Sequence, residues 1–322
     1  MNDKIENLLE EKRKFSPKTE LSQKANATSE WFDEANENRL EFWKKQALER
    51  ITWFKEPSEI FDGSNAPFFK WFKDGELNVS YNCLDRHLET DGDRVAFYWE
   101  GEPGDTQKIT YQDLYERVCR LSNSLKKLNV KKGDRVAIYL GMTPEIVVAM
   151  LACARIGAVH SVVFGGFSSE ALADRINDAK AKLVITADGA WRRGEIVPLK
   201  DNVDGSLELT DYIDNVIVVK RTNQDIKMKQ GRDHWYHEIT EKEQPVCEPE
   251  IMNAEDMLYI LYTSGTTAKP KGIVHTQAGY LTGVTTTHHE VFDIKDDDIY
   301  WCAADCGWVT GHSYIVYGPL AN

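Results

Sequence analysis

The segment at positions 262–272, YTSGTTAKPKG, concentrates groups that bind phosphate. Hydroxyls and backbone N–H groups donate hydrogen bonds to phosphate oxygens, glycine allows close approach, and ammonium groups supply positive charge. A Walker A loop would need glycine where Pro270 stands, so that motif is excluded. The sequence therefore predicts a polyphosphate-binding loop of another kind. Its candidate residues are Thr263, Ser264, Gly265, Thr266, Thr267, Lys269 and Lys271.

The charge distribution around this loop favours a phosphate site over an ordinary surface loop. The chain carries a formal net charge of −13, with 52 acidic residues among 322. The 33 residues between Asp256 and Glu290 contain no Asp or Glu, where the average composition would give about five. A solvated loop has no reason to exclude carboxylates, whereas a phosphate site does. The same acidity argues against a general nucleic-acid-binding protein.

An alternation of apolar runs and helical patterns is expected to position the loop. The runs are rich in Val and Ile and apolar on both faces, which is typical of a parallel sheet covered by helices. The sequence therefore predicts an α/β fold. We predict strands at 94–99, 135–140, 158–164, 182–187, 215–219, 257–262, 273–275 and 299–303, and helices at 111–128, 144–156, 168–179 and 277–291.

The N-terminal residues differ in character from this alternating region. Residues 1–30 are polar and predict a tail that contributes little to the core. Apolar residues at three- and four-residue steps predict an amphipathic helix over 34–54. The aromatic residues between 53 and 72 predict an irregular segment packed onto a larger body. Packing is favoured over a ligand cage because the rings follow no ligand-like spacing. The polar stretch at 201–254 predicts a surface excursion with one strand.

Composition also restricts the compartment. The first thirty residues lack the basic start and apolar stretch of a secretory signal. The longest apolar stretch, 146–167, is interrupted by Arg155 and His160, so no bilayer span is predicted. Six cysteines without a CxxC pair fit a reducing cytosol. We therefore predict a soluble cytoplasmic protein without nucleic-acid or membrane partners.

Several other side chains that could do chemistry favour ordinary roles. Cys302 and Cys306 have only His312 nearby in sequence, so free thiols in a packed strand and turn are favoured over a zinc site. His312 is interpreted as a hydrogen-bonded packing residue and not a base. His288 and His289 are interpreted as exposed helical residues and not metal ligands. No metal site is predicted.

The loop resembles the phosphate-loop signature of the adenylate-forming superfamily of acyl-CoA synthetases, [YL]-T-S-G-[ST]-T-G-K-P-K-G. Ten of its eleven positions agree, and Ala268 stands where the family has glycine. If that position requires a positive φ, alanine would cost about 1 kcal/mol.

Longer segments are similar to the acetyl-CoA synthetase branch of this superfamily. They include GDRVAIYLGMTPEIVVAMLACARIGAVHSVVFGGFS at 133–168, LVITADGAWRRGEIVPLK at 183–200 and DIYWCAADCGWVTGHSYIVYGPLAN at 298–322. The resemblance covers nearly the whole chain, excluding the first thirty residues and the polar excursion. The FGGFS and GWVTGHSY runs indicate a short-chain branch.

The resemblance implies a domain organisation: a polar tail at 1–30, an N-terminal cap at 31–85, and an adenylate-forming domain at 86–322. In the family, the adenine motif, the acidic ribose contact, the hinge and the catalytic lysine all lie beyond the position that matches Asn322. We therefore expect an N-terminal fragment with a truncated domain, inactive alone in acyl-adenylate formation.

The resemblance also implies a reaction and its participants. Acetate would react with Mg²⁺-bound ATP to give acetyl-adenylate and pyrophosphate, and the acetyl group would pass to CoA with release of AMP. The loop residues would hold the β- and γ-phosphates. The remaining implied sites are Trp308 as gate of the CoA tunnel, Val309 in the acyl pocket, Thr310 in contact with CoA, and Arg192, Arg193, Gly194 and Glu195 at the nucleotide end of CoA.

Two features leave alternatives open. Glu195 stands where these relatives have an arginine, and a carboxylate beside a phosphate is unfavourable, although Arg193 could replace the charge. Without the family, the arginine pair would be an exposed surface feature and Trp308 a core aromatic. The alternatives are a ligase for propionate, 3-hydroxypropionate or acetoacetate, or a non-catalytic nucleotide- or CoA-binding remnant. Oligomeric state is not predicted.

Overall fold

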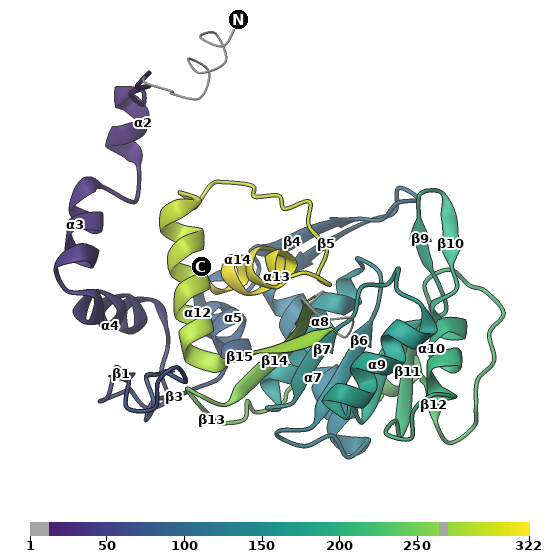
Figure 1. Ribbon diagram of the computed structural model, residues 1–322. Coiled ribbons are helices and arrows are strands. Elements are labelled where there is room, and N and C mark those ends of the chain that lie inside the picture. Colours follow the sequence, from purple (N-terminus) through teal and green to yellow (C-terminus); the bar gives the residue numbers. More distant parts are fainter. Residues whose placement is uncertain (1–12, 264–269) are drawn as a thin grey trace, which may run out of the picture.

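The computed structural model describes residues 13–263 and 270–322. Within these ranges the chain folds around a seven-stranded sheet (Figure 1). Its strands, in chain order, are β6 (Arg135–Tyr139), β7 (Val159–Val162), β8 (Leu183–Ala187), β11 (Asn215–Val219), β12 (Asp233–Trp235), β14 (Met257–Thr263) and β15 (Lys271–Thr276). They lie in the order β12-β11-β8-β6-β7-β14-β15. The first six are parallel, and β15 at the edge runs antiparallel to β14. The predicted α/β class is confirmed, with a mixed sheet.

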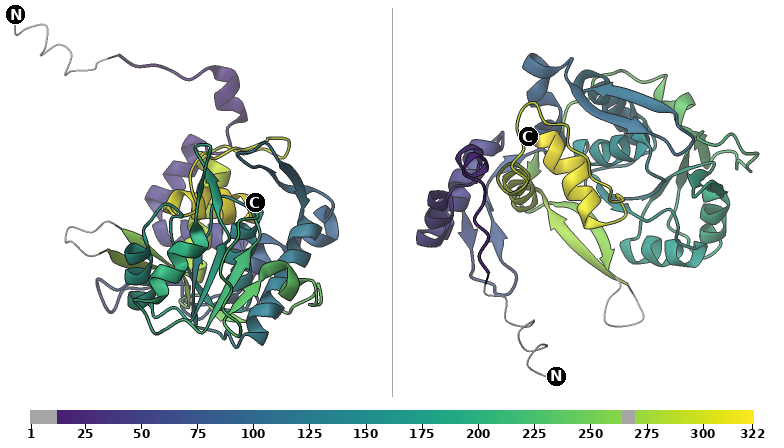
Figure 2. Two further views of the ribbon diagram at one scale, coloured as in Figure 1. Left: turned by 90° about the vertical axis from the view of Figure 1, so that its right-hand side faces the viewer. Right: turned by 90° about the horizontal axis from the view of Figure 1, so that it is seen from above.

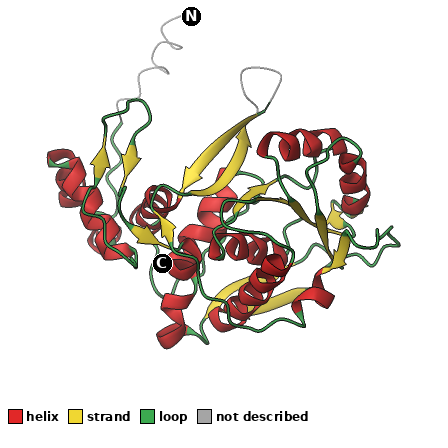
Figure 3. Ribbon diagram, turned by 90° about the horizontal axis from the view of Figure 1, so that it is seen from below, coloured by secondary structure: helices red, strands yellow, loops and turns green. Residues whose placement is uncertain are grey.

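Helices cover both faces of the sheet (Figure 3). The main ones are α7 (Tyr111–Lys127), α8 (Pro144–Arg155), α9 (Ser169–Ala179) and α10 (Leu199–Leu207). Helix α7 packs against α8 on one face, and α9 packs against α10 on the other. Local signals set where these helices begin. Thr110 and Asp113 form a capping box at α7, and the hydroxyl of Ser168 accepts from a backbone N–H of α9.

The central strands are buried on both faces, as predicted from their composition. Every side chain of β8 is buried, as are four of the five in β6 and in β11. No helix in the described part of the chain is long and apolar enough to cross a membrane.

Smaller strand pairs surround the main sheet. The strand predicted at 94–99 exists as β4 (Val95–Glu100), but its expected place in the parallel sheet is wrong. It pairs antiparallel with β5 (Thr106–Thr110). Only five residues separate the two strands, so a local hairpin forms with little loss of chain entropy. The other pairs are β1 (Phe61–Asp62) with β2 (Lys70–Trp71), β3 (Glu76–Leu77) with β13 (Met252–Asn253), and β9 (Ala190–Arg192) with β10 (Glu195–Val197).

The C-terminal segment differs from prediction at one strand. The strand expected at 299–303 does not form, and Ile299 and Trp301 are each 84% exposed. No neighbouring strand pairs with this stretch, so its apolar pattern finds no ladder. The remaining helical elements are α5 (Val79–Cys83), α6 (Asp85–Asp91), α11 (Tyr236–Thr240), α12 (Gln277–Thr286), the π-helical turn η1 (Thr287–Val291), α13 (Val309–Gly311), the π-helical turn η2 (His312–Tyr317) and α14 (Gly318–Ala321). The run from η2 to α14 packs against α12 (Figure 2).

The N-terminal segment contains α2 (Thr19–Lys24), α3 (Ser29–Glu37) and α4 (Arg39–Arg50). The single helix expected over 34–54 is therefore divided. Asn38 ends α3, and its side chain accepts a hydrogen bond from the backbone N–H of Glu41 at the start of α4. Of the rings between 53 and 72, Phe72 is buried, whereas Phe68 and Phe69 are exposed. The aromatic segment thus packs only in part.

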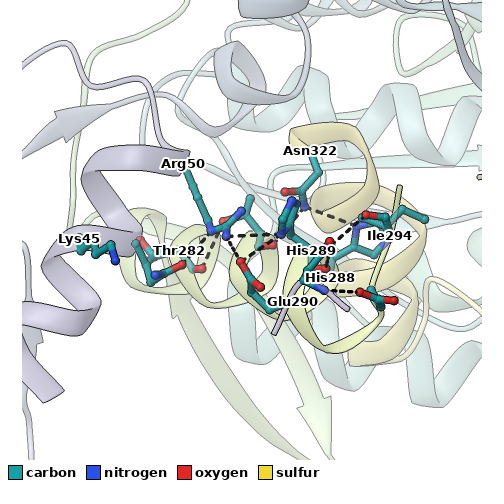
Figure 4. Close-up of polar contacts among 12 residues, drawn as sticks. Lys45, Arg50, Thr282, His288, His289, Glu290, Ile294 and Asn322 are labelled. Atoms are coloured by element: carbon teal, nitrogen blue, oxygen red, sulfur yellow. Dashed lines mark hydrogen bonds and ion pairs between the residues drawn. The ribbon is translucent and has the colours of Figure 1, made fainter. Parts of the chain in front are cut away.

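Polar contacts hold α4 and the residues before α3 against the end of α12 (Figure 4). The amide of Asn26 donates to the carbonyls of His289 and Ile294, at 2.8 and 3.1 Å. Arg50 forms an ion pair with the buried Glu290. Segments distant in sequence are therefore fixed to each other by groups that are mostly removed from water.

His288 corrects one prediction. It was expected to be exposed on a helix, but it is buried in η1, where its ring packs edge-on against Tyr300 with centroids 4.9 Å apart. Its Nδ1 lies 3.4 Å from the side-chain amide of Asn322. Helix α14 packs against η1, which is why the ring is covered. Burial lowers the pKa of His288 to about 4, so the ring is neutral at pH 7.

Candidate functional site

Strands β14 and β15 present the two ends of the predicted phosphate loop. Their antiparallel register places Thr263 opposite Lys271 and Tyr262 opposite Gly272. Thr263 and Lys271 are both exposed at this end of the sheet. The other candidates, Ser264, Gly265, Thr266, Thr267 and Lys269, together with Ala268, lie outside the described residues.

The ring of Tyr262 lies close against Gly272. A Cβ atom at Gly272 would lie 2.9 Å from Cγ2 of Ile260 and 3.2 Å from the Tyr262 ring. Real Cβ atoms essentially never approach heavy atoms more closely than 3.0 Å. A glycine is therefore needed at this position of the hairpin, and it lets the Tyr262 ring cover the strand beside Lys271.

Helix α9 holds Tyr262 at two points. The phenol donates a hydrogen bond to Oδ2 of Asp178 at 2.7 Å, and the guanidinium of Arg175 lies 5.5 Å from the ring centroid. Burial raises the pKa of Tyr262, so its hydroxyl remains a donor at neutral pH. Arg175 also lies 4.6 Å from the ring centroid of Phe167. The sequence analysis did not single out Arg175.

A second group of predicted residues lies around Trp308. The Trp308 ring contacts the rings of Phe164 and Phe167, with centroids 5.7 and 6.5 Å away. Trp308 is 49% exposed, so it is not the core aromatic that composition alone favoured. Val309 and Thr310, which follow it, are also exposed. The structure thus presents three consecutive predicted residues on the surface beside an aromatic cluster.

Arg192 joins this cluster from the β9–β10 hairpin. Its guanidinium lies 4.7 Å from the centroid of the Phe164 ring. A side chain at Gly166 would overlap that guanidinium, so the glycine of the FGGF turn makes room for it. Arg192 and Trp308 therefore share Phe164 as a neighbour.

The tip of the same hairpin carries the other residues predicted at the nucleotide end of CoA. Arg193 and Gly194 both have positive φ, 56° and 80°, as a tight two-residue turn requires. The backbone N–H of Gly194 donates to the carboxylate of Glu102. Glu195 is exposed and lies opposite Arg192 in the register. Its negative charge is consequently close to the positive charges of the tip.

His312 supports the Trp308 turn from within the core. It is fully buried, and its Nδ1 lies 3.1 Å from the carbonyl of Trp308. Burial lowers the pKa of His312 to about 4, which keeps the ring neutral at pH 7. Its interpretation as a hydrogen-bonded packing residue is confirmed.

The arrangement can bind and orient ligands. The hairpin offers a hydroxyl and an ammonium group, and the aromatic cluster offers an exposed indole flanked by guanidinium groups. Across residues 13–263 and 270–322, no group of three His, Cys, Asp or Glu side chains could hold a metal ion. Among the two cysteines of this region, Cys306 is buried, and burial raises the pKa of its thiol.

Replacing Gly311 by alanine is expected to destabilise the fold by about 1–3 kcal/mol, the usual cost of overpacking. A Cβ atom there would overlap the carbonyl of Asp305 and lie 2.6 Å from Cα of Cys306, and backbone atoms cannot rotate away. Urea unfolding followed by circular dichroism measures the change.

Gly283→Ala is the matched control. Gly283 lies in α12, and a Cβ atom there would meet nothing within 4 Å. This substitution is expected to stabilise the helix by about 0.5–1 kcal/mol. Equal effects at the two glycines would contradict the close packing of the Trp308 turn.

Comparison with protein families identifies two matching regions. The family model described as AMP-binding enzyme matches residues 84–322, and the model described as acetyl-coenzyme A synthetase N-terminus matches residues 28–83.

Curated relatives match the whole chain. An acetyl-coenzyme A synthetase of Streptomyces avermitilis is 58% identical over 323 residues, covering 100% of this chain and 49% of the relative. One from Streptomyces coelicolor is 56% identical, covering 100% of this chain and 50% of the relative. One from Pasteurella multocida is 55% identical over 98% of this chain and 49% of the relative. The chain spans about half the length of these relatives.

Proposed function

The chain belongs to the AMP-binding enzyme family, and from this premise we propose that it binds ATP and CoA as part of an AMP-forming acetate–CoA ligase. The relatives above are named acetyl-coenzyme A synthetases. The observation that carries the proposal is the β14–β15 hairpin, which holds Thr263 and Lys271 exposed and opposite each other.

The proposed reaction has two steps. A carboxylate oxygen of acetate attacks the α-phosphorus of ATP, and pyrophosphate leaves. The sulfur of CoA then attacks the acyl carbon, and AMP leaves. In the first step the protein mainly positions the reactants and stabilises the charge of the leaving pyrophosphate.

In this proposal the hairpin residues hold the β- and γ-phosphates. Thr263 donates a hydrogen bond and Lys271 supplies positive charge, together with Ser264, Gly265, Thr266, Thr267 and Lys269. We propose that Mg²⁺ arrives with the nucleotide and neutralises part of its charge. Hydroxyl and ammonium groups bind phosphate oxygens and do not compete with them for the cation.

The surface around Trp308 is proposed to receive CoA and the acyl group. Arg192, Arg193 and Gly194 would hold the nucleotide end of CoA, and Thr310 would contact it. Trp308 would close the passage for the thiol-bearing arm, and Val309 would line the acyl pocket. The contact of both Arg192 and Trp308 with Phe164 supports this placement. Glu195 lies opposite Arg192, so it is expected to weaken the attraction for phosphate there.

The remaining parts of the proposal are the organisation and the setting. We propose a tail at 1–30, a cap at 31–85 and the adenylate-forming domain from 86 to 322. We also propose that the protein acts in the cytoplasm on small-molecule substrates, without nucleic-acid or membrane partners.

Lys271→Ala tests the phosphate site. We expect the affinity of the 322-residue chain for Mg²⁺-bound ATP to fall about tenfold to a hundredfold. A charged hydrogen bond is worth about 1.5–3 kcal/mol, and each 1.4 kcal/mol is a factor of ten. Isothermal titration calorimetry measures the dissociation constants.

The control for this experiment is Lys220→Ala, which removes an exposed lysine just after β11. Its affinity for ATP should stay within about twofold of the unsubstituted chain, because surface charges at a distance are screened by salt. Equal affinities of the Lys271→Ala variant and the unsubstituted chain would contradict the proposed site.

A further inference from the structure

Arg175 has an environment that is uncommon for an arginine. The side chain is only 9% exposed. Its Nη1 donates to the carbonyl of Ala171 on the same helix at 2.6 Å. In the part of the chain that the structure describes, no carboxylate lies within ion-pair distance of it. Burial without an anionic partner lowers the pKa of Arg175, although the group remains charged. Buried charges are usually paired, so this one calls for another explanation.

Two aromatic rings take the place of an anion around this guanidinium. The Phe167 centroid lies 4.6 Å from its central carbon and the Tyr262 centroid 5.5 Å from it. The negative face of an aromatic ring attracts a cation, and the attraction is larger when water is excluded. Phe167 and Tyr262 thus meet through Arg175, and no ring pair joins them directly among the described residues. Arg175 therefore fixes the position of each ring relative to the other.

The two rings belong to different parts of the proposed site. Tyr262 immediately precedes Thr263 and covers Gly272 beside Lys271. Phe167 contacts Trp308, and it also packs edge-on against Phe164, with centroids 5.5 Å apart. The phosphate hairpin and the Trp308 cluster are consequently connected by an unbroken series of side-chain contacts, with Arg175 in its middle.

We infer that Arg175 is a positioning residue, which holds the phosphate hairpin and the Trp308 cluster in a fixed relation through its two aromatic contacts. This inference rests on the proposed function for the identity of the ligands. Close-packed side chains transmit displacement because they leave no room for independent movement. Phosphate binding at Thr263 therefore alters the surroundings of Trp308, where the acyl group and CoA are proposed to arrive. Coupling of this kind needs direct measurement, since contact alone does not establish it.

A mutant cycle without any ligand tests the mechanical part. Tyr262→Leu and Phe167→Leu are made singly and together, first in the unsubstituted chain and then in the Arg175→Met background. Urea unfolding gives the equilibrium constant of each variant. We expect the two ring substitutions to be coupled by at least about threefold in the unfolding constant when Arg175 is present, and to be independent when it is absent.

Two variants keep this cycle decisive. Tyr262→Phe removes the hydrogen bond to Asp178 and keeps the ring, so its coupling to Phe167 should persist. Arg175→Lys replaces Arg175→Met if the latter fails to fold. It keeps the charge and loses the planar group that lies against both rings. The coupling should then fall below that of the unsubstituted chain. Coupling that is equally strong without the guanidinium would overturn the inference.

Fluorine NMR tests the part that depends on the ligand. The chain is labelled with 5-fluorotryptophan, and Trp308→Phe identifies the Trp308 resonance. Mg²⁺-bound ATP is expected to shift that resonance in the unsubstituted chain. In Arg175→Met, ATP should still bind, as calorimetry will show, but the Trp308 resonance should not respond.

The outcomes of the two experiments separate the two proposals. An equal shift of the Trp308 resonance with and without Arg175 overturns the positioning role. If the unsubstituted chain binds no ATP, the proposed function is contradicted, and the ligand-free cycle alone decides whether Arg175 joins the two rings.

Discussion

Replacing Asp85 by alanine is expected to destabilise the protein by about 3–5 kcal/mol, the cost of breaking a buried ion pair from one side. Arg155 at the end of α8 is 1% exposed, and its two terminal nitrogens lie 2.7 and 2.9 Å from the carboxylate of Asp85. Without that carboxylate a positive charge stays in the core with no counter-charge. Urea unfolding followed by far-ultraviolet circular dichroism measures the loss.

An ion pair of the same geometry at the surface provides the control. Arg221 also binds Asp105 through both terminal nitrogens, at 2.7 and 2.9 Å, but the Asp105 side chain is 44% exposed. Asp105→Ala should cost less than about 1 kcal/mol, because water solvates the freed guanidinium. Similar losses for Asp85→Ala and Asp105→Ala would show that burial does not determine the strength of these pairs.

The Arg155 pair also shows where prediction from sequence stops. Arg155 interrupts an apolar stretch, which was sufficient to exclude a membrane span. Its partner lies 70 positions earlier, in α6, and no local pattern connects the two. A charge in an apolar run indicates that a partner exists, but only the fold shows which residue it is.

Elements defined by local patterns were predicted well. The strands and helices from α7 to α9 begin and end within two residues of their expected positions, because caps, proline and periodicity lie within each segment. Elements defined by a distant partner were not. The stretch at 299–303 has strand-like composition but no strand beside it, and β4 joined a local hairpin in place of the main sheet. Strand pairing depends on contacts that a single segment does not contain.

The candidate site shows the same division. The hairpin that carries Thr263 and Lys271 was recognised from its sequence, because the motif is contiguous. Arg175 was missed, although a signal existed. It occurs three residues after Leu172 and four before Ala179, on the face of α9 that is buried. A charged residue on the apolar face of a predicted helix deserves consideration as part of a site, because burying it requires a specific partner.

Lowering the pH from 7.5 to 5 is expected to destabilise the protein by about 2 kcal/mol for each of His288 and His312. Both are buried, and burial lowers each pKa to about 4, against about 6.5 in the unfolded chain. Between these values the unfolded state binds more protons than the folded state. Stability is therefore complete above pH 6.5, falls as the pH decreases towards 4, and is independent of these groups below that. Urea unfolding at half-unit pH steps measures the profile.

The pH window separates these histidines from the carboxylates. Hydrogen bonds hold the pKa values of Asp62 and Asp74 below the usual range, so their contribution is lost only as the pH falls below about 4. His288→Gln keeps a neutral polar side chain and lies outside the proposed site, so ATP binding serves as a check of its fold. This variant should lose about half as much stability between pH 7.5 and 5 as the unsubstituted chain. An unchanged pH dependence would show that the fold accepts a proton on His288 without cost, which its burial against Tyr300 and α14 excludes.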